Sequence, residues 1–318
     1  MSRLDHFSQQ RVLVVGDAMV DRYLCGKARR LCPEGPVPVV AVDQVNEAAG
    51  GAANTAVNVA QLGATAALLS VMGKDADGAA LQQRLGCCGV KLLAIAAPER
   101  TTLTKQRVVA NGQIVVRFDQ GSTTPITAAR QEQLMAQLDR DSAPFDAVIV
   151  SDYGYGVCTP QVVQALIKQT PIAIVDSKRL PAYRHLSPTA VKPNYAETIA
   201  LLDLPPAADR LAQMRSQGDA LLAATGAKIV VVTLDIDGAL TFEAGQPPHH
   251  QPAHPAPDGH AVGAGDTFVS ALTLALAAGA TGIEATAIAS AATAVVVQSP
   301  GTTTCSLNAL KSRMESSL

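Results

Sequence analysis

The sequence predicts an α/β fold, a doubly wound and mainly parallel sheet flanked by helices on both faces. Short apolar runs alternate with Ala- and Leu-rich helical stretches, as in such sheets. The 318 residues are 48% hydrophobic, which is enough to bury a large core. The expected strands are residues 12–15, 67–71, 147–150, 172–175, 229–232 and 240–242. Ligands of open parallel sheets bind beyond the carboxyl ends of the strands, so the polar residues that follow several of them predict a cleft: Asp17, Asp152, Asp176 and Thr233.

A second, smaller sheet is also expected. Residues 104–118 contain two β-like runs around Asn111-Gly112, a dipeptide typical of a tight antiparallel hairpin. Residues 37–42 would add a further strand. A sheet made from two excursions out of the main domain fits a lid that keeps water from a phosphoryl donor, and an ordinary edge hairpin is the alternative.

Composition narrows the class of protein. The formal charge is −2 and no long basic run occurs, so nucleic acid is not an expected partner. The first ten residues lack the apolar core of a signal peptide, and no apolar run approaches the roughly 20 residues that span a bilayer. We therefore expect a cytoplasmic protein without a membrane segment. The six cysteines show no C-x-x-C spacing and predict reduced thiols.

The stretch Ala261-Val262-Gly263-Ala264-Gly265-Asp266-Thr267-Phe268 is the most informative motif. It opens a helix, and the free N–H groups of a first helical turn bind anions, while glycines let a phosphate approach the backbone. Asp266 beside that anion is well placed to take a proton from a hydroxyl that attacks phosphorus. The motif predicts phosphoryl transfer to an alcohol, and a plain helix start with an acidic first turn is the alternative.

A second glycine-rich segment, Gly50-Gly51-Ala52-Ala53-Asn54, opens another helix, which ends near Gly63. The Asn54 amide suits sugar hydroxyls, and the Asp17 and Asp21 carboxylates suit the same polyol. The alternative is that the glycines serve close helix packing and that both aspartates are turn residues.

With these motifs the chain resembles the ribokinase (carbohydrate kinase PfkB) family over essentially its full length. The segment Lys192-Pro193-Asn194-Tyr195-Ala196-Glu197 fits the family in order and spacing. Residues 14–23, 33–40, 151–153 and the hairpin segment 102–107 look most like the kinase module that phosphorylates O1 of D-glycero-β-D-manno-heptose 7-phosphate. The resemblance implies one ribokinase-like kinase domain over residues 1–318, with lid excursions at about 20–46 and 100–120.

The resemblance also implies roles for individual residues. Asp266 would be the base, and the Gly263, Ala264 and Gly265 amides would form the anion hole. Asn194 and Glu197 would organise Mg²⁺, largely through water, and the phosphates of ATP. The residues expected to bind the sugar phosphate are Asp17, Asp21, Gly50, Gly51, Asn54, Asp152 and the clamp pair Lys105 and Arg107. Those expected along the nucleotide are Lys178, Thr233, Gly238, Ser290 and Gly301.

Three departures from the family pattern leave questions open. His260-Ala261-Val262 replace an acid and a threonine that help to shape a monovalent-cation site, so activation by K⁺ stays undecided. Residues 152–156 lack the lysine of the heptose-kinase pattern. The family's Asp-Pro-Lys-Gly is here Asp176-Ser177-Lys178-Arg179, in which Lys178 is either a phosphate contact or a solvated lysine.

The sequence leaves three functional hypotheses. They are a kinase for a phosphorylated heptose, a related kinase for another sugar, sugar phosphate or nucleoside, and a catalytically weak relative that binds nucleotide or sugar. No His-x-Gly-His nucleotidyltransferase signature occurs up to Leu318, so we expect a stand-alone kinase. A homodimer through the lid is also expected. The histidines in the proline-rich stretch before the catalytic turn fit a surface loop better than a metal site: His249, His250, His254 and His260.

Overall fold

The large sheet of the computed structural model confirms the expected architecture. The structure describes residues 3–141, 143–254, 262–299 and 301–316, so His260 and Ala261 lie outside it. The strand order is β15-β14-β13-β12-β11-β10-β1-β4-β6. Every neighbouring pair from β13 to β6 is parallel. The strands are β1 (Arg11–Gly16), β4 (Thr65–Leu69), β6 (Lys91–Leu92), β10 (Ala147–Asp152), β11 (Ile172–Ser177), β12 (Ala190–Val191), β13 (Ile229–Thr233), β14 (Ala239–Glu243) and β15 (His249–Gln251).

Two of the strands expected from the sequence differ in the structure. The run 240–242 was expected in the parallel set, but β14 pairs antiparallel with β13 because a short 3₁₀ turn, η3 (Asp235–Asp237), joins them and a parallel crossover needs a dozen or more residues. The run 67–71 is divided between two strands. β4 ends at Leu69, and β5 (Val71–Gly73) pairs with β7 (Ile95–Ala97) in a separate two-stranded sheet.

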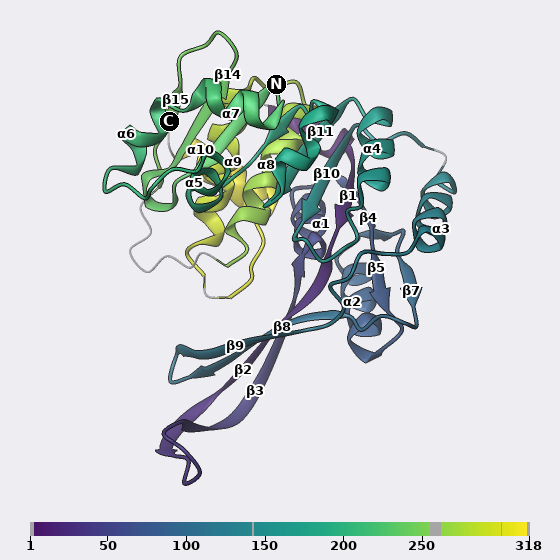
Figure 1. Ribbon diagram of the computed structural model, residues 1–318, viewed down its shortest axis with the longest axis vertical. Helices are drawn as coiled ribbons and strands as arrows, with labels where there is room; N and C mark the ends of the chain where they lie inside the picture. Colours follow the sequence, from purple (N-terminus) through teal and green to yellow (C-terminus); the bar gives the residue numbers. More distant parts are fainter. Residues whose placement is uncertain (1–2, 142, 255–261, 300, 317–318) are drawn as a thin grey trace.

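The small sheet consists of β2 (Ala18–Leu31), β3 (Pro38–Gly51), β8 (Leu103–Ala110) and β9 (Gln113–Gln120), in the order β3-β2-β8-β9. It projects away from the helices and the large sheet (Figure 1). The predicted hairpin is present: Asn111 has φ 52° and Gly112 φ 82°, as a two-residue hairpin turn requires. The run 37–42 lies at the start of β3. The two excursions therefore join through the parallel pair β2–β8.

Helices cover both faces of the large sheet, and successive residues of β1 divide between two cores. Val12 and Val14 belong to the core with α1, α2, α8, α9 and α10, whereas Leu13 and Val15 belong to the core with α3, α4, α6 and α7. The helices are α1 (Ala52–Gln61), α2 (Ala76–Cys87), α3 (Ala128–Asp139), α4 (Pro160–Gln169), α5 (Tyr195–Leu202), α6 (Arg210–Arg215), α7 (Gly218–Thr225), α8 (Ala264–Ala277), α9 (Gly282–Val296) and α10 (Leu307–Glu315), with 3₁₀ turns η1 (Arg3–Gln9) and η2 (Leu180–Leu186).

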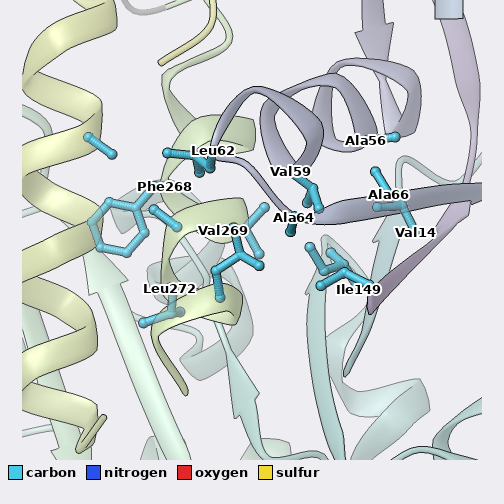
Figure 2. Packing of buried hydrophobic residues seen from close by; sticks show 14 of the residues in the cluster. Val14, Ala56, Val59, Leu62, Ala64, Ala66, Ile149, Phe268, Val269 and Leu272 are labelled. Atoms are coloured by element: carbon cyan, nitrogen blue, oxygen red, sulfur yellow. The ribbon is translucent and has the colours of Figure 1, made fainter. Parts of the chain in front are cut away.

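Helices α1 and α8 pack together through one of these cores. Figure 2 shows Val59 of α1 and Leu62, the residue just after α1, near Phe268 and Val269 of α8, and all four are buried in the same cluster. Close packing of this kind resists small displacements of one helix past another. The core therefore fixes the distance between the N-terminal ends of α1 and α8, where both glycine-rich motifs lie. Among the described residues, no helix is long and apolar enough to cross a membrane.

Candidate active site

The first turn of α8 presents unpaired backbone N–H groups. Gly263 caps the helix with φ 81°, a left-handed conformation that favours glycine, and no side chain caps the turn. A Cβ on Gly263 would also lie 3.1 Å from Asn54 Nδ2. Together with Ala264 and Gly265, this turn has the free N–H groups that the predicted anion site requires.

Asp266 lies in that first turn with 7% of its surface exposed. Its Oδ2 accepts a hydrogen bond from Asn54 Nδ2 at 2.7 Å, and its Oδ1 accepts from Tyr153 Oη at 2.9 Å and from Thr55 Oγ1 at 3.3 Å. Burial raises the pKa of Asp266, and the hydrogen bonds from Asn54 and Tyr153 oppose that rise. A carboxylate has roughly four acceptor positions. The remaining one is on Oδ2, where a substrate hydroxyl can donate its proton.

Lys192 is a site residue to which the sequence analysis gave no role. It follows β12 with 5% of its surface exposed, and its Nζ lies 3.3 Å from Asp176 Oδ1 and 3.6 Å from the position of a Cβ on Gly265. Burial lowers the pKa of Lys192, but Asp176 and Glu197 outweigh burial and the pKa is raised. Burial raises the pKa of Asp176 to about 6 although Lys192 lowers it. Lys192 is thus a fixed cation beside the anion-binding turn. Its position directly after a buried strand was the signal that could have identified it.

Asn194 and Glu197 form a capping box at the start of α5. Asn194 Oδ1 accepts from the Glu197 N–H, and Glu197 Oε2 accepts from the Asn194 N–H, both at 2.9 Å. These bonds leave Glu197 Oε1 and the N–H groups of the Asn194 side-chain amide for other partners. Hard oxygen ligands with intervening water suit Mg²⁺. The residues therefore fit a hydrated Mg²⁺, with Asp176 as a second carboxylate close to Lys192.

The carboxylates of Asp17 and Asp152 are placed differently from the expectation that they contact the sugar. Asp17 is fully buried and accepts hydrogen bonds from the N–H groups of Tyr153, Tyr155 and Val157 at 3.0, 3.0 and 3.1 Å. Asp152 is 3% exposed, and its oxygens accept hydrogen bonds from side chains at the adjacent C-terminal end of β11, at the residue before η2 and in η2. Those partners are Arg179, Ser177 and Tyr183. Both carboxylates therefore stabilise the chain segments that follow β10 and β11.

The two residues of the expected clamp, Lys105 and Arg107, contact different groups. Arg107 Nη1 lies 2.7 Å from Asp21 Oδ1, and both side chains are less than a tenth exposed. Asp21 Oδ2 also accepts from Thr302 Oγ1 at 3.2 Å. Arg107 therefore neutralises Asp21 rather than standing free for a phosphate. Lys105 Nζ instead lies over the Tyr153 ring, 4.5 Å from its centroid, where burial lowers the pKa of the ammonium.

The glycines at the end of β3 permit close approach to these groups. A Cβ on Gly50 would lie 2.8 Å from Asp21 Oδ2, and one on Gly51, whose φ is 56°, would lie 2.6 Å from the Asp17 carbonyl oxygen. Asn54, three residues further on in the first turn of α1, is 2% exposed and contacts Asp266. The structure therefore brings Asp21, Gly51 and Asn54 close to Asp266.

The residues expected along the nucleotide are more scattered. Thr233 ends β13 and bridges to Asn194. A Cβ on Gly238 would collide with the Gln251 carbonyl oxygen. The close packing between β14 and β15 therefore explains why this residue is a glycine. Ser290 lies inside α9 with 9% of its surface exposed, Gly301 lies in the following loop with φ 81°, and Lys178 is exposed. Among the described residues, no hydrogen bond joins these five residues to Asp266.

Known proteins are similar to this chain in sequence and in fold. The profile of the pfkB family carbohydrate kinases matches residues 9–309. The chain is 36% identical over 302 residues to the bifunctional protein HldE of Caulobacter vibrioides, covering 93% of this chain and 62% of that protein. It is 35% identical over 320 residues to the bifunctional protein HldE of Klebsiella pneumoniae, covering 98% and 66%. The chain thus spans less than two thirds of the length of these relatives.

Solved structures support the same assignment of fold. Phosphofructokinase-2 from Escherichia coli in complex with potassium superposes with a TM-score of 0.80 at 23% identity, covering 97% of this chain and 99% of that one. A ribokinase from Thermotoga maritima gives 0.74 at 18% identity, covering 96% and 99%. The fold and the family profile together define a carbohydrate kinase. The chain belongs to the pfkB family.

Proposed function

We propose that this kinase transfers the γ-phosphoryl group of ATP to O1 of D-glycero-β-D-manno-heptose 7-phosphate, giving the 1,7-bisphosphate. The observation that carries the proposal is the buried Asp266 carboxylate, which keeps one acceptor position on Oδ2 beside the unpaired amides of α8. Identities of 35–37% to proteins named HldE support the choice of substrate class. So does the resemblance of residues 14–23, 33–40 and 151–153 to a heptose kinase module.

In the proposed reaction Oδ2 of Asp266 takes the proton of the sugar hydroxyl as that oxygen attacks the γ-phosphorus and the bond to ADP breaks. The amides of Gly263, Ala264 and Gly265 stabilise the charge on the transferring group, and the Lys192 ammonium adds a fixed cation. When Mg²⁺ is bound through water by Asn194 and Glu197, it neutralises charge on the ATP phosphates. Asn54 holds the Asp266 carboxylate in place.

The proposal includes a lid and a dimer. The small sheet, as a lid on a single kinase domain, closes over the sugar, and Lys105 moves from the Tyr153 ring to the phosphate already on the substrate. Apolar side chains stay exposed on the small sheet, including Val45 at 53%, Val116 at 49% and Phe118 at 40%. They support a homodimer that buries this surface. A cytoplasmic location suits an enzyme that uses ATP.

The test is ATP turnover against a panel of sugars, sugar phosphates and nucleosides with Mg²⁺, each with and without K⁺. Asp266→Asn should lower kcat about 10²-fold or more and leave nucleotide affinity nearly unchanged, because the base acts mainly in the transition state. If a nucleoside or a neutral sugar is the best acceptor, the heptose phosphate assignment is wrong. If no acceptor raises ADP release above background while nucleotide or sugar binds, the protein is a binding relative rather than a kinase.

A further inference from the structure

Tyr153 connects the catalytic carboxylate to the small sheet. Its hydroxyl donates to Asp266 Oδ1 at 2.9 Å, the one hydrogen bond of that hydroxyl among the described residues. One face of its ring contacts the Lys105 ammonium. A Cβ on Gly51 would lie 3.3 Å from the ring carbon Cε2. The ring is thus held between a cation on β8 and the glycine turn before α1, with its hydroxyl on the base.

The loop that carries Tyr153 is built around a buried anchor. The Asp17 carboxylate accepts the backbone N–H groups of Tyr153 and Tyr155, and Gly154 between them has φ 80°. This local geometry holds the backbone of the loop, and the Tyr153 hydroxyl is not needed for it. A purely structural role for the ring would be satisfied equally well by phenylalanine. The hydroxyl therefore needs a separate explanation.

We propose that Tyr153 is a positioning residue that orients the Asp266 carboxylate through its hydroxyl and so directs the free acceptor position of Oδ2 at the substrate. The hydrogen bond from Tyr153, with those from Thr55 and Asn54, fixes the rotation of the carboxylate about its last bond. An unrestrained carboxylate would rotate about this bond, and its acceptor positions would point at the substrate hydroxyl only part of the time. The inference rests on the proposed function, because Asp266 is the base in it.

The same hydrogen bond affects the basicity of Asp266. Burial, followed by the charge of Asp266, raises the pKa of Tyr153 well above its ordinary value, so the hydroxyl remains a donor at working pH. A donor to the charged form lowers the pKa of a carboxyl, so loss of the hydroxyl should raise the pKa of Asp266. The other charged groups that act on Asp266 or are acted on by it come from β2, β8, β11 and the residue after β12. They are Asp21, Lys105, Asp176 and Lys192.

The decisive comparison is Tyr153→Phe with Tyr155→Phe. Tyr155 stacks on Tyr153 with ring centroids 6.5 Å apart and also faces Lys105, but its hydroxyl does not contact Asp266. Each variant keeps its ring, and equal melting temperatures would verify the fold. We expect the acid limb of kcat to move to higher pH in Tyr153→Phe, with about a tenfold loss on the acid side and a smaller loss on the alkaline plateau. Tyr155→Phe should keep the wild-type profile.

A second measurement separates this inference from the kinase assignment. The Asp266 carboxyl can be titrated in the free protein by ¹³C NMR of labelled aspartate, with Asp266→Asn to identify its signal. Its pKa should be higher in Tyr153→Phe than in the wild type and unchanged in Tyr155→Phe. If no acceptor is phosphorylated, the proposed function fails, and the titration still decides whether Tyr153 controls Asp266. If an active enzyme shows neither the shifted limb nor the shifted titration, the inference is overturned.

Discussion

Lys192 and Lys178 can be compared directly as candidate contacts for a phosphoryl group. Both follow neighbouring parallel strands, but Lys192 is buried beside Asp176 and Gly265, whereas Lys178 is exposed. The sequence favoured Lys178 because it occupies the lysine position of the family's Asp-Pro-Lys-Gly. The structure favours Lys192 because a cation excluded from water interacts more strongly with a phosphoryl group.

Lys192→Met should therefore lower kcat about 10²-fold, as expected for loss of one positioned charge, and Lys178→Met should stay near wild type. Without Lys192, the pKa of Asp176, already raised to about 6 by burial, should rise further because an attractive cation is gone. Asp176 then becomes neutral near neutral pH, so the fold should tolerate the change. Steady-state kinetics of both variants with saturating ATP measure the effect. Equal losses in the two variants would remove Lys192 from the mechanism.

The sequence predicted Asp266 and Asn54 as site residues, but it did not predict the hydrogen-bond network around them. Asn54 and Asp266 are 212 positions apart and Tyr153 and Asp266 are 113 apart, so no local pattern records these pairs. Glycine-rich turns are visible in sequence because backbone conformation restricts the residue type. A tyrosine or lysine that acts through a distant partner carries no such restriction. The same reason explains why the sequence predicted Arg107 as a phosphate clamp although its guanidinium pairs with Asp21.

At the scale of elements, the β8–β9 turn offers a clean test of backbone conformation. Gly112 has φ 82° and a Cβ there would meet no atom within 4 Å, so only the dihedral angle restricts the residue. Gly112→Ala should lower the free energy of unfolding by about 1–2 kcal/mol. Gly35→Ala is the control, because Gly35 also has open space but no positive φ. Urea denaturation of the two variants measures the difference, and equal stability would contradict the assigned turn.

Elements with local signals were predicted well, and those that depend on partners were not. The Asn111-Gly112 hairpin and the helices at Ala52 and Ala264 follow from turn chemistry and glycine positions. The long strand β2 was missed because residues 18–31 carry five charged side chains and show no regular alternation of apolar and polar residues. Its pairing with β3 and β8 stabilises it. The direction of β14 was missed because apolar runs do not encode orientation.

At the scale of the whole molecule, the proposed dimer predicts which surface charges disrupt assembly. Val116 and Phe118 lie two residues apart on one face of β9 and are 49% and 40% exposed. Val116→Asp/Phe118→Asp should convert a dimer into monomers in sedimentation velocity, because two carboxylates would be buried without partners. Ile236→Asp, at a position in η3 that is 85% exposed, should leave the dimer intact. A wild-type monomer at micromolar concentration would refute the dimer.

The pairing of β2 with β8 has a consequence for the order in which the chain folds. The β8–β9 hairpin needs only its own two-residue turn, and such hairpins form in about 1–10 μs. The ion pair between β2 and β8 joins residues 86 positions apart, so the chain between them must already be compact when that contact forms. We therefore expect the β8–β9 hairpin to form first, and the β2–β8 pairing that completes the small sheet to follow once the chain between residues 21 and 107 is compact.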